Sequence, residues 1–388
     1  MKVHCLSIKI VIINMRVLHV TQTYYPDTRG GIEEVIRQIT LNTKMLGVET
    51  RVLALSKNPI PTVIEIDGVK VYCAPLTIKI SSCGMSIVAF KQFKDLADWA
   101  QIINYHFPWP FMDLLHFLNN INAKTILTYH SDVVRQKKLL MLYKPLMNRF
   151  LHQIDVIVAT SDNYAKSSNV LQNYKEKVRT IPIGVSQQSY PVPTKQKLDE
   201  IEGRIGKDFF LFIGTLRKYK GLHVLLNALK NTKLQLIIAG SGPEEVALKR
   251  LAQKLKLSNV EFMGRVSDVD KVALIKLCLA VVLPSNLRSE AFGVVLLEGA
   301  MYKKPLISTE LGTGTSYVNI NGETGLVVPP ADVSLLRGSM LLLNNDKELA
   351  NKMGGNAFKR YNKFFTGSVM GDQYAELYKT LLRRASGD

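Results

Sequence analysis

Short apolar runs alternate with longer amphipathic stretches along almost the whole chain, and this alternation limits the possible folds more than any other feature. The runs are rich in Val, Ile and Leu, as is typical of strands buried on both faces of a parallel sheet. The intervening stretches are long enough for crossover helices. The runs are Arg16–Val20, Thr50–Leu55, Ile102–Tyr105, Thr125–Tyr129, Val156–Ala159, Thr180–Ile183, Phe209–Ile213, Leu234–Ala239, Val260–Phe262, Ala280–Leu283, Pro305–Ser308 and Gly325–Val328. The pattern predicts an α/β protein with two doubly wound, Rossmann-like domains that face a cleft.

The length of 388 residues also favours two domains, because a single core stops growing at about 250–300 residues. The segment Ser186–Lys197 is polar, contains two prolines and has no apolar period. We therefore expect an N-terminal domain over residues 1–185, a linker over 186–206 and a second domain over 207–365. A C-terminal helix would follow over residues 366–388, and its return to the first domain is one option.

Residues 1–14 precede a complete strand-loop-helix start at Met15. They are either an overcalled translation start or an added edge strand, and the sequence leaves both interpretations open. No run of about 18 apolar residues suggests a membrane-spanning helix. The four cysteines have neither zinc spacing nor a disulfide pattern, which favours a reducing, cytoplasmic compartment.

The net charge is unusual, with 50 basic and 32 acidic residues and a balance of +18. Such a charge favours an anionic partner: nucleic acid, a phosphorylated substrate or an acidic lipid surface. We expect no nucleic acid, because the sequence has no zinc finger, RNA-recognition signature or clustered basic arm. The basic amphipathic segment Val133–Phe150, which Pro145 interrupts, suits an anionic membrane surface or packing against the sheet.

Two motifs resemble ligand sites but have simpler interpretations. Gly240-Ser241-Gly242-Pro243 follows a predicted strand, as a dinucleotide fingerprint would, but the third glycine position holds Glu245. A tight turn before a helix explains it better. Asp268-Val269-Asp270 mimics a metal-binding D-x-D motif, yet Ser267 before it predicts a helix N-cap with acids in the first turn. We therefore predict no metal site.

The stretch from Pro284 to Ala300 carries the strongest functional signal. It begins as a loop and becomes apolar at helical length, with Glu290 in the loop and Glu298 about two turns into the helix. Backbone N–H groups of Phe292 and Gly293 at the helix start could hold a phosphate. A capping Glu290 and a surface Glu298 would be the purely structural interpretation.

Two histidines each end a predicted strand of the first half. They are His106, in Asn-Tyr-His-Phe, and His130, in Tyr-His-Ser-Asp, with Asp132 two residues further on. A single histidine is more often a packed core residue, but two at strand ends point to a functional site.

The E-x7-E motif formed by Glu290 and Glu298 resembles the signature of retaining glycosyltransferases of family 4, which have the GT-B fold. The resemblance covers nearly the whole chain, because further family motifs recur in order. They are Gly30-Gly31-Ile32-Glu33, Ile181–Val185, Phe212-Ile213-Gly214 through Lys220-Gly221, Gly240–Pro243, Phe262-Met263-Gly264, Gly312-Thr313-Gly314 and Thr324–Val327.

The resemblance implies roles for individual residues on the donor side. Glu298 would hold the ribose hydroxyls, Glu290 would meet the transferred sugar, and Lys220 and Arg217 would neutralise the departing diphosphate. The family commonly has arginine directly after the glycine equivalent to Gly214, but this chain has threonine there and its arginine two residues later. Further donor contacts are implied for Gly31, Phe292 and Gly293.

On the acceptor side the resemblance implies contacts from Gly30, His106, His130 and Asp132. His130 would also lie near the reacting sugar, so it joins Glu290, Lys220 and Arg217 in the implied catalytic set. Retaining transfer without a protein nucleophile implies front-face attack, in which the acceptor hydroxyl gives its proton to the leaving phosphate oxygen. No cofactor and no metal is expected.

The segments around His106 and His130 resemble mannosyltransferases of O-antigen assembly. We therefore expect a hexosyltransferase that uses GDP-mannose and a lipid-linked glycan acceptor, peripheral on the inner face of the cytoplasmic membrane. A UDP-sugar-dependent transferase and a nucleotide-sugar epimerase remain as alternatives, and a basic nucleic-acid-binding protein is a remote one.

Overall fold

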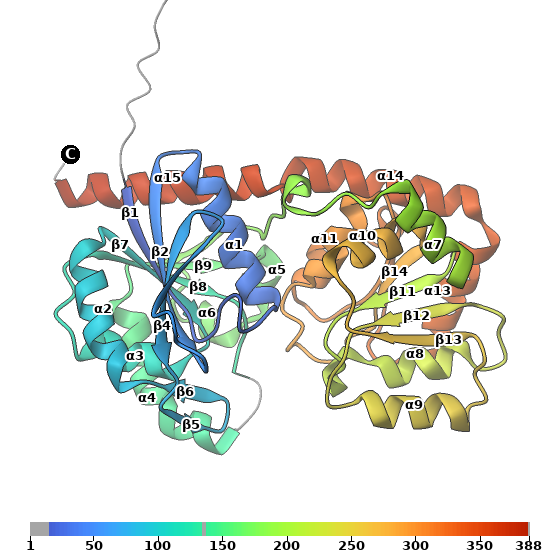
Figure 1. Cartoon of the computed structure of the whole chain (residues 1–388), viewed down its shortest axis with the longest axis horizontal. Coiled ribbons are helices and arrows are strands. Elements are labelled where there is room, and N and C mark those ends of the chain that lie inside the picture. Colours follow the sequence, from blue (N-terminus) through green and yellow to red (C-terminus); the bar gives the residue numbers. More distant parts are fainter. Residues whose placement is uncertain (1–14, 134–136, 387–388) are drawn as a thin grey trace, which may run out of the picture. The chain divides into compact units, whose positions relative to one another are not determined.

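The computed structural model describes residues 15–133 and 137–386, so the predictions for residues 1–14 lie outside the described part. The chain forms two compact units, residues 1–126 with 371–388 and residues 127–370. Figure 1 shows helices packed around each of two large sheets. The expected doubly wound α/β fold is confirmed, and the domain boundaries expected from the sequence stay predictions.

The first sheet has eight strands in the order β10-β9-β8-β7-β1-β2-β4-β3. The pairs β1–β2, β1–β7, β2–β4 and β9–β10 are parallel, whereas the edge strand β3 is antiparallel to β4. The strands are β1 (Met15–Val20), β2 (Val48–Ser56), β3 (Val63–Ile66), β4 (Val69–Pro75), β7 (Ile102–Phe107), β8 (Lys124–Tyr129), β9 (Val156–Ala159) and β10 (Val178–Thr180). A separate hairpin consists of β5 (Ile78–Ile80) and β6 (Cys83–Met85).

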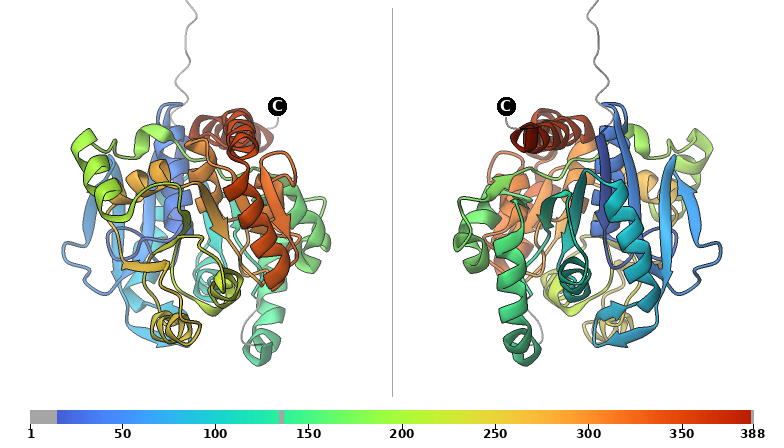
Figure 2. Two further views of the ribbon diagram at one scale, coloured as in Figure 1. Left: turned by 90° about the vertical axis from the view of Figure 1, so that its right-hand side faces the viewer. Right: turned by 90° about the vertical axis from the view of Figure 1, so that its left-hand side faces the viewer.

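The helices that accompany the first sheet are α1 (Gly31–Lys44), α2 (Ile87–Trp99), α3 (Pro110–Phe117), α4 (Lys137–Gln153), α5 (Asp162–Ser167) and α6 (Asn169–Gln172). The last helix, α15 (Gly367–Ser386), contributes to the first compact unit from Gly371 onward. It lies beside α1 (Figures 1 and 2), where Gly371 packs so closely on Asn42 that a Cβ would overlap it. Among the described helices, none combines the length and apolar composition needed to cross a bilayer.

The second sheet has six strands in the order β13-β12-β11-β14-β15-β16, and every neighbouring pair is parallel. The strands are β11 (Phe210–Ile213), β12 (Leu236–Ala239), β13 (Val260–Gly264), β14 (Ala280–Leu283), β15 (Leu306–Thr309) and β16 (Gly325–Val328). Its α-helices are α7 (Lys195–Ile205), α8 (Leu222–Leu229), α9 (Glu245–Lys254), α10 (Asp268–Leu277), α11 (Val294–Met301), α12 (Gly314–Val318), α13 (Val333–Asn345) and α14 (Lys347–Phe364).

Strand order places one topological switch point in each sheet. In the second sheet the chain moves from β11 outward to β13 and then returns to β14 on the other side of β11. In the first sheet the corresponding neighbours are β1 and β7. Ligands of open α/β sheets bind beyond the carboxyl ends of the strands at such a point. The loops after β1, β7, β11 and β14 are therefore the segments to examine.

The strand predictions from the sequence were largely confirmed. The structure differs from the sequence analysis in two strand assignments and in the segment expected as a linker. The strand expected at Thr180–Ile183 was placed too late, because β10 covers Val178–Thr180. Strands β3 to β6 were missed. Strand β5 is exposed, and β3 and the start of β4 alternate in burial, so they show no continuous apolar run. The segment expected as a linker contains helix α7, whose Ile201 and Ile205 are buried.

Candidate functional site

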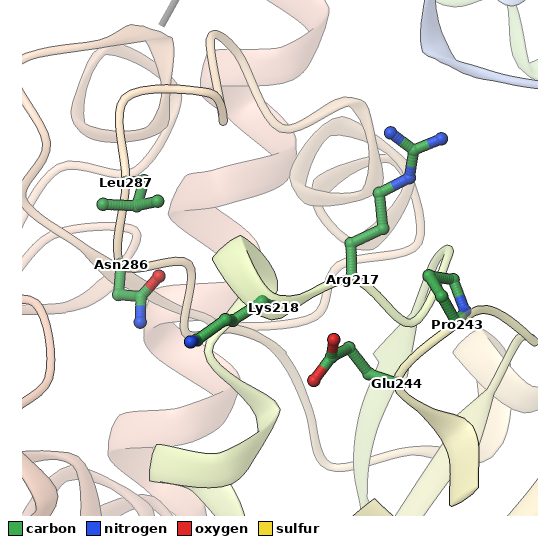
Figure 3. Close-up of a pocket in the computed structure, with 6 residues that line it drawn as sticks. All are labelled: Arg217, Lys218, Pro243, Glu244, Asn286 and Leu287. Atoms are coloured by element: carbon green, nitrogen blue, oxygen red, sulfur yellow. The ribbon is translucent and has the colours of Figure 1, made fainter. Parts of the chain in front are cut away.

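The switch point of the second sheet carries a pocket of about 660 Å³. The loops after β11, β12 and β14 all contribute to it, so the carboxyl ends of three neighbouring strands surround one space. Figure 3 shows the residues that line it, Arg217, Lys218, Pro243, Glu244, Asn286 and Leu287. This is the position that strand order predicts for a ligand.

The loops after β11 and β14 are joined by a close backbone approach at Gly221. This glycine has φ of +70°, in the left-handed region that disfavours other residues. A Cβ at this position would also overlap the carbonyl oxygen of Pro284. Next to it, the Asn286 N–H donates to the Tyr219 carbonyl over 2.8 Å. Glycine is therefore required here for two independent reasons.

This contact places Lys220 against Glu290. The Lys220 Nζ lies 2.5 Å from the Glu290 Oε2, and both side chains are mostly buried. The Ser285 hydroxyl donates to the same carboxylate oxygen over 2.9 Å. Burial by itself would lower the pKa of Lys220, but the adjacent Glu290 carboxylate outweighs it and raises this pKa above its usual value. Lys220 therefore carries its charge at neutral pH.

Arg217 and Lys218 lie on the same loop but are exposed. Arg217 is the N-cap of the short 3-10 helix Lys218–Lys220. In Figure 3 its guanidinium points away from the other labelled side chains, whereas Lys218 extends toward the side of Asn286. The loop thus presents two exposed cations beside the buried Lys220.

Glu298 is also buried, so the alternative of a surface residue is wrong. It is the fifth residue of α11, one turn into the helix rather than the expected two. Its Oε1 accepts a hydrogen bond from the Tyr190 hydroxyl at 3.0 Å and lies 2.9 Å from the Lys271 Nζ. The Lys271 Nζ also lies 4.7 Å from the centre of the Tyr190 ring. Two side chains that the sequence did not single out therefore hold this carboxylate by one oxygen.

The start of α11 differs from a regular helix end. Its N-cap, Gly293, has φ of +85°, and an added Cβ would crowd Leu283 and Leu296. The Phe292 side chain is buried with its ring edge-on to Phe365. Within the described part of the chain, the backbone N–H groups of Phe292 and Gly293 make no hydrogen bond. They remain candidates for a phosphate contact.

The structural interpretations of the two other motifs are confirmed. In the turn Gly240–Pro243, the Ser241 carbonyl accepts a bond from the Leu216 N–H, so the turn fastens α9 to the loop after β11. The Ser267 hydroxyl caps α10 by accepting from the Asp270 N–H. Asp270 also pairs with Lys197 at 3.1 Å, and the Ser267 hydroxyl bond is the main cause that lowers the pKa of Asp270.

In the first sheet, a pair of buried histidines lies at the switch point between β1 and β7. The His19 Nδ1 and the His106 Nε2 are 2.9 Å apart, and their rings stack. Burial lowers the pKa of His19 to about 3, so it is neutral at physiological pH. The sequence suggested His106 but not His19, which lies inside an apolar run. Gly30 caps α1, and Gly31 begins it with open space where a side chain would be.

His130 follows β8 and is buried, and burial lowers its pKa to about 3. It therefore enters any reaction as a neutral imidazole. The Asp132 Oδ1 accepts from the Tyr129 and Ser168 hydroxyls, and its Oδ2 lies 3.5 Å from Arg288. Both oxygens of Asp132 already have protein partners, which fits a structural role beside the acceptor contact that the sequence suggested.

The structure thus brings together Lys220, Glu290 and Ser285 in one cluster and Glu298, Tyr190 and Lys271 in another, within one compact unit. Gly30, Gly31 and His106 belong to the other unit. A pocket with two cations at the switch point of a parallel sheet is a position where an anionic ligand can bind.

Two family models match the chain. "Glycosyltransferase Family 4" matches residues 29–188, and "Glycosyl transferases group 1" matches residues 194–360. The D-rhamnosyltransferase WbpZ of Pseudomonas aeruginosa is 51% identical over 91% of this chain and 92% of its own length. The O-antigen chain mannosyltransferase C of Escherichia coli is 45% identical over 96% of this chain and 100% of its own. The chain belongs to the family 4 glycosyltransferases, and it is a glycosyltransferase.

Solved structures support the fold independently. The sucrose-phosphate synthase of Thermosynechococcus elongatus superimposes with a TM-score of 0.79 at 19% identity, covering 95% of this chain and 100% of that one. HepE of Anabaena, solved in complex with UDP and glucose, gives a TM-score of 0.76 at 17% identity, covering 94% and 100%. The fold is therefore GT-B, as the sequence predicted.

The close approach at Gly221 can be tested with alanine. Gly221→Ala should lower the free energy of unfolding by about 1–3 kcal/mol, because alanine disfavours the left-handed backbone and its Cβ would displace Pro284. Gly203→Ala is the matched control: it lies inside α7, has no atom within 4 Å of an added Cβ, and should stabilise by about 0.5–1 kcal/mol. Urea unfolding measures both, and equal stability of the two variants would contradict the close approach.

Proposed function

We propose that this glycosyltransferase moves a hexosyl group from a nucleoside diphosphate sugar to a lipid-linked glycan in O-antigen synthesis, with retention of configuration and without a metal. The Lys220–Glu290 pair at the switch point of the second sheet is the observation that supports the proposal most directly. It puts a buried cation and a carboxylate side by side beside a basic pocket. The name of the 45% identical mannosyltransferase supports the acceptor class.

The cations of the loop after β11 suit the leaving group. Departure of a nucleoside diphosphate concentrates negative charge on phosphate oxygens, and fixed cations stabilise that charge as it develops. Lys220 is mostly buried and held by Glu290, so little reorganisation accompanies the reaction. Exposed Arg217 and Lys218 add charge at the pocket rim, and this set would replace a metal ion.

The proton and the bonds balance in a front-face mechanism. The acceptor oxygen forms the new bond to the anomeric carbon as the bond to the phosphate oxygen breaks on the same face. The acceptor proton passes to that departing oxygen. His130, as a neutral imidazole, would contact the sugar or the acceptor rather than remove the proton.

GDP-mannose is the proposed donor, since the chain is 45% identical to a mannosyltransferase. D-Rhamnose is the second candidate sugar, because the 51% identical relative is named a D-rhamnosyltransferase. The two sugars differ only at carbon 6, where mannose carries a hydroxyl and D-rhamnose does not. HepE is solved with UDP, so a UDP-sugar is included among the donors to be tested.

A donor panel tests the proposal directly. With a lipid-linked glycan acceptor, the enzyme should transfer mannose from GDP-mannose faster than glucose from UDP-glucose, and the new linkage should keep the donor's configuration by NMR. Excess chelator should leave the rate unchanged. Conversion of the donor to a free epimer without acceptor would indicate an epimerase instead, and a strict Mg²⁺ requirement would contradict the metal-free reaction.

The phosphate contacts can be separated by substitution. Lys220→Ala should lower kcat by about 10²–10³-fold, since loss of one preorganised contact to a developing charge costs about 2–4 kcal/mol. Arg217→Ala should cost much less, because its exposed side chain is solvated and less well fixed. Steady-state kinetics at saturating acceptor measures both. Near-normal turnover of Lys220→Ala would remove this residue from the mechanism.

The two glutamates should act on different parts of the donor. Glu298→Gln should weaken the binding of free GDP, because the ribose is the proposed partner of Glu298. Tyr190→Phe should do so more mildly, since Tyr190 only positions that carboxylate. Glu290→Gln should bind GDP normally but turn over slowly, because an interaction strengthened in the transition state raises the rate rather than the affinity. Calorimetric titration with GDP measures these affinities. If Glu290→Gln weakened GDP binding and Glu298→Gln did not, the ribose would lie at Glu290 and the sugar at Glu298.

We further propose a peripheral position on the inner face of the cytoplasmic membrane, with anionic lipid as a partner. Helix α4 has Leu139, Met141 and Leu142 exposed on its first half, while Met147 and Phe150 of the second half are buried. The helix therefore uses its carboxyl half for packing and leaves apolar side chains near Lys144 in contact with solvent. Arg135 of this segment lies outside the described residues.

A further inference from the structure

The β5–β6 hairpin of the first unit is packed in an unusual way. Its strands pair Ile78 with Met85, Lys79 with Gly84, and Ile80 with Cys83. Because directly opposed residues of an antiparallel pair share a face, the two isoleucines, the methionine and the cysteine lie on one face of the hairpin. Lys79 and Gly84 lie on the other. In most hairpins the apolar face would cover the core.

Here the glycine face packs against the unit instead. Gly84 is buried, and a Cβ on it would touch Leu55 and Leu76. The Gly84 carbonyl accepts from the Trp109 indole N–H at 2.9 Å. The Ser82 carbonyl accepts from the Gln22 amide at 2.7 Å. These contacts hold the hairpin, labelled below β4 in Figure 1, to the unit through Ser82 and Gly84, while Ile78 and Ile80 stay exposed.

Ile78 and Ile80 of the hairpin are strongly exposed, and exposed apolar side chains recur at the start of helix α2, which follows β6 after Ser86. Ile78 and Ile80 are 50% and 57% exposed, and Ile87 and Val88, the first two residues of α2, are 72% and 46% exposed. Four large aliphatic side chains within eleven residues of sequence therefore contact water, although the Ser86 hydroxyl caps α2 and fixes its start. Exposed aliphatic side chains gathered in one short stretch of a folded protein indicate a surface that lipid or another molecule covers.

The charges around the patch indicate what covers it. Residues 68–94 contain four lysines and no aspartate or glutamate, and the next acid, Asp95, lies about two turns into α2. Lys91 and Lys94 are exposed and lie four and seven residues after Ile87, on the same side of α2. Lys79 is also exposed, on the opposite face of the hairpin. Apolar side chains flanked by lysines match an anionic bilayer, in which the aliphatic groups enter the acyl boundary and the ammonium groups stay among the lipid phosphates. A second copy of the chain is a poorer match, because its lysines would repel the lysines of this surface.

We propose that the β5–β6 hairpin and the start of α2 form a lipid-contacting surface that inserts Ile78, Ile80, Ile87 and Val88 into anionic membrane. The surface is distinct from helix α4. This inference deepens the peripheral attachment proposed above, and it depends on that attachment. It adds a specific insertion point in the first compact unit, on the part of the chain that precedes β7.

Vesicle binding separates this surface from α4. The double variant I78S/I80S should partition onto phosphatidylglycerol-containing vesicles at least about tenfold more weakly than the wild type, while its thermal unfolding transition and its GDP titration stay unchanged, which shows that both compact units are folded. V246S/L335S removes two aliphatic side chains of similar exposure elsewhere and should bind vesicles normally. M141S/L142S tests α4 in the same assay. Vesicles of phosphatidylcholine alone should bind all variants weakly.

Insertion depth provides a second measurement. The fluorescence of the Ile80→Trp variant should be quenched by brominated anionic lipid beyond the baseline of the two native tryptophans, whereas Val246→Trp should add no quenching. Absence of added quenching in Ile80→Trp, with wild-type protein still bound to vesicles, would overturn the hairpin surface and leave peripheral attachment standing. No vesicle binding by the wild type would overturn both. A dimer in solution that I78S/I80S dissociates would identify the patch as a contact between copies and overturn the lipid assignment.

Discussion

The contact between the loop after β11 and the loop after β14 determines the geometry of the candidate site. Gly221 lies against the Pro284 carbonyl, and the Asn286 N–H is bonded to Tyr219 next to it. These two strands are neighbours at the switch point, so their loops lie next to each other beyond the carboxyl ends of the strands. The pairing of Lys220 with Glu290 follows from that contact, as does the shape of the pocket beside it.

Electrostatics explains why this site needs its carboxylates. An isolated buried ammonium group is costly, and the first effect of burial is to lower the pKa of a lysine. Glu290 reverses that effect at Lys220, so a full positive charge is maintained in a position poorly reached by water. Glu298 is held in a comparable way by Lys271 and Tyr190. In both clusters a carboxylate and a cation stabilise each other while atoms of the group stay available to a ligand.

Aliphatic side chains are buried in the core of the sheets but exposed in two segments of the surface. The inner strands β12, β14 and β15 bury all of their aliphatic side chains, whereas Ile78 and Ile80 of the β5–β6 hairpin and Leu139, Met141 and Leu142 of α4 are exposed. In the hairpin the close packing is at Gly84, because a Cβ at this position would overlap Leu55 and Leu76. The exposed isoleucines lie within a segment that carries only positive charge.

Much of this could be predicted from the sequence, because the relevant information is local. Runs such as Phe209–Ile213 and Ala280–Leu283 identify strands since both faces are buried, and the resemblance of the E-x7-E motif to the family signature identifies Glu290 and Glu298. The partners of those residues depend on distant parts of the chain. Tyr190 is 108 residues from Glu298, Lys220 is 70 residues from Glu290, and neither distance has a local signature. His19 was hidden inside an apolar run, and the three-residue strands β5 and β6 are too short to show a period.

The sequence by itself therefore determined the sheets, the fold and the residue types of the site. The tertiary structure decided which charges meet and which apolar face stays outside, because those outcomes depend on packing between segments that the chain order separates.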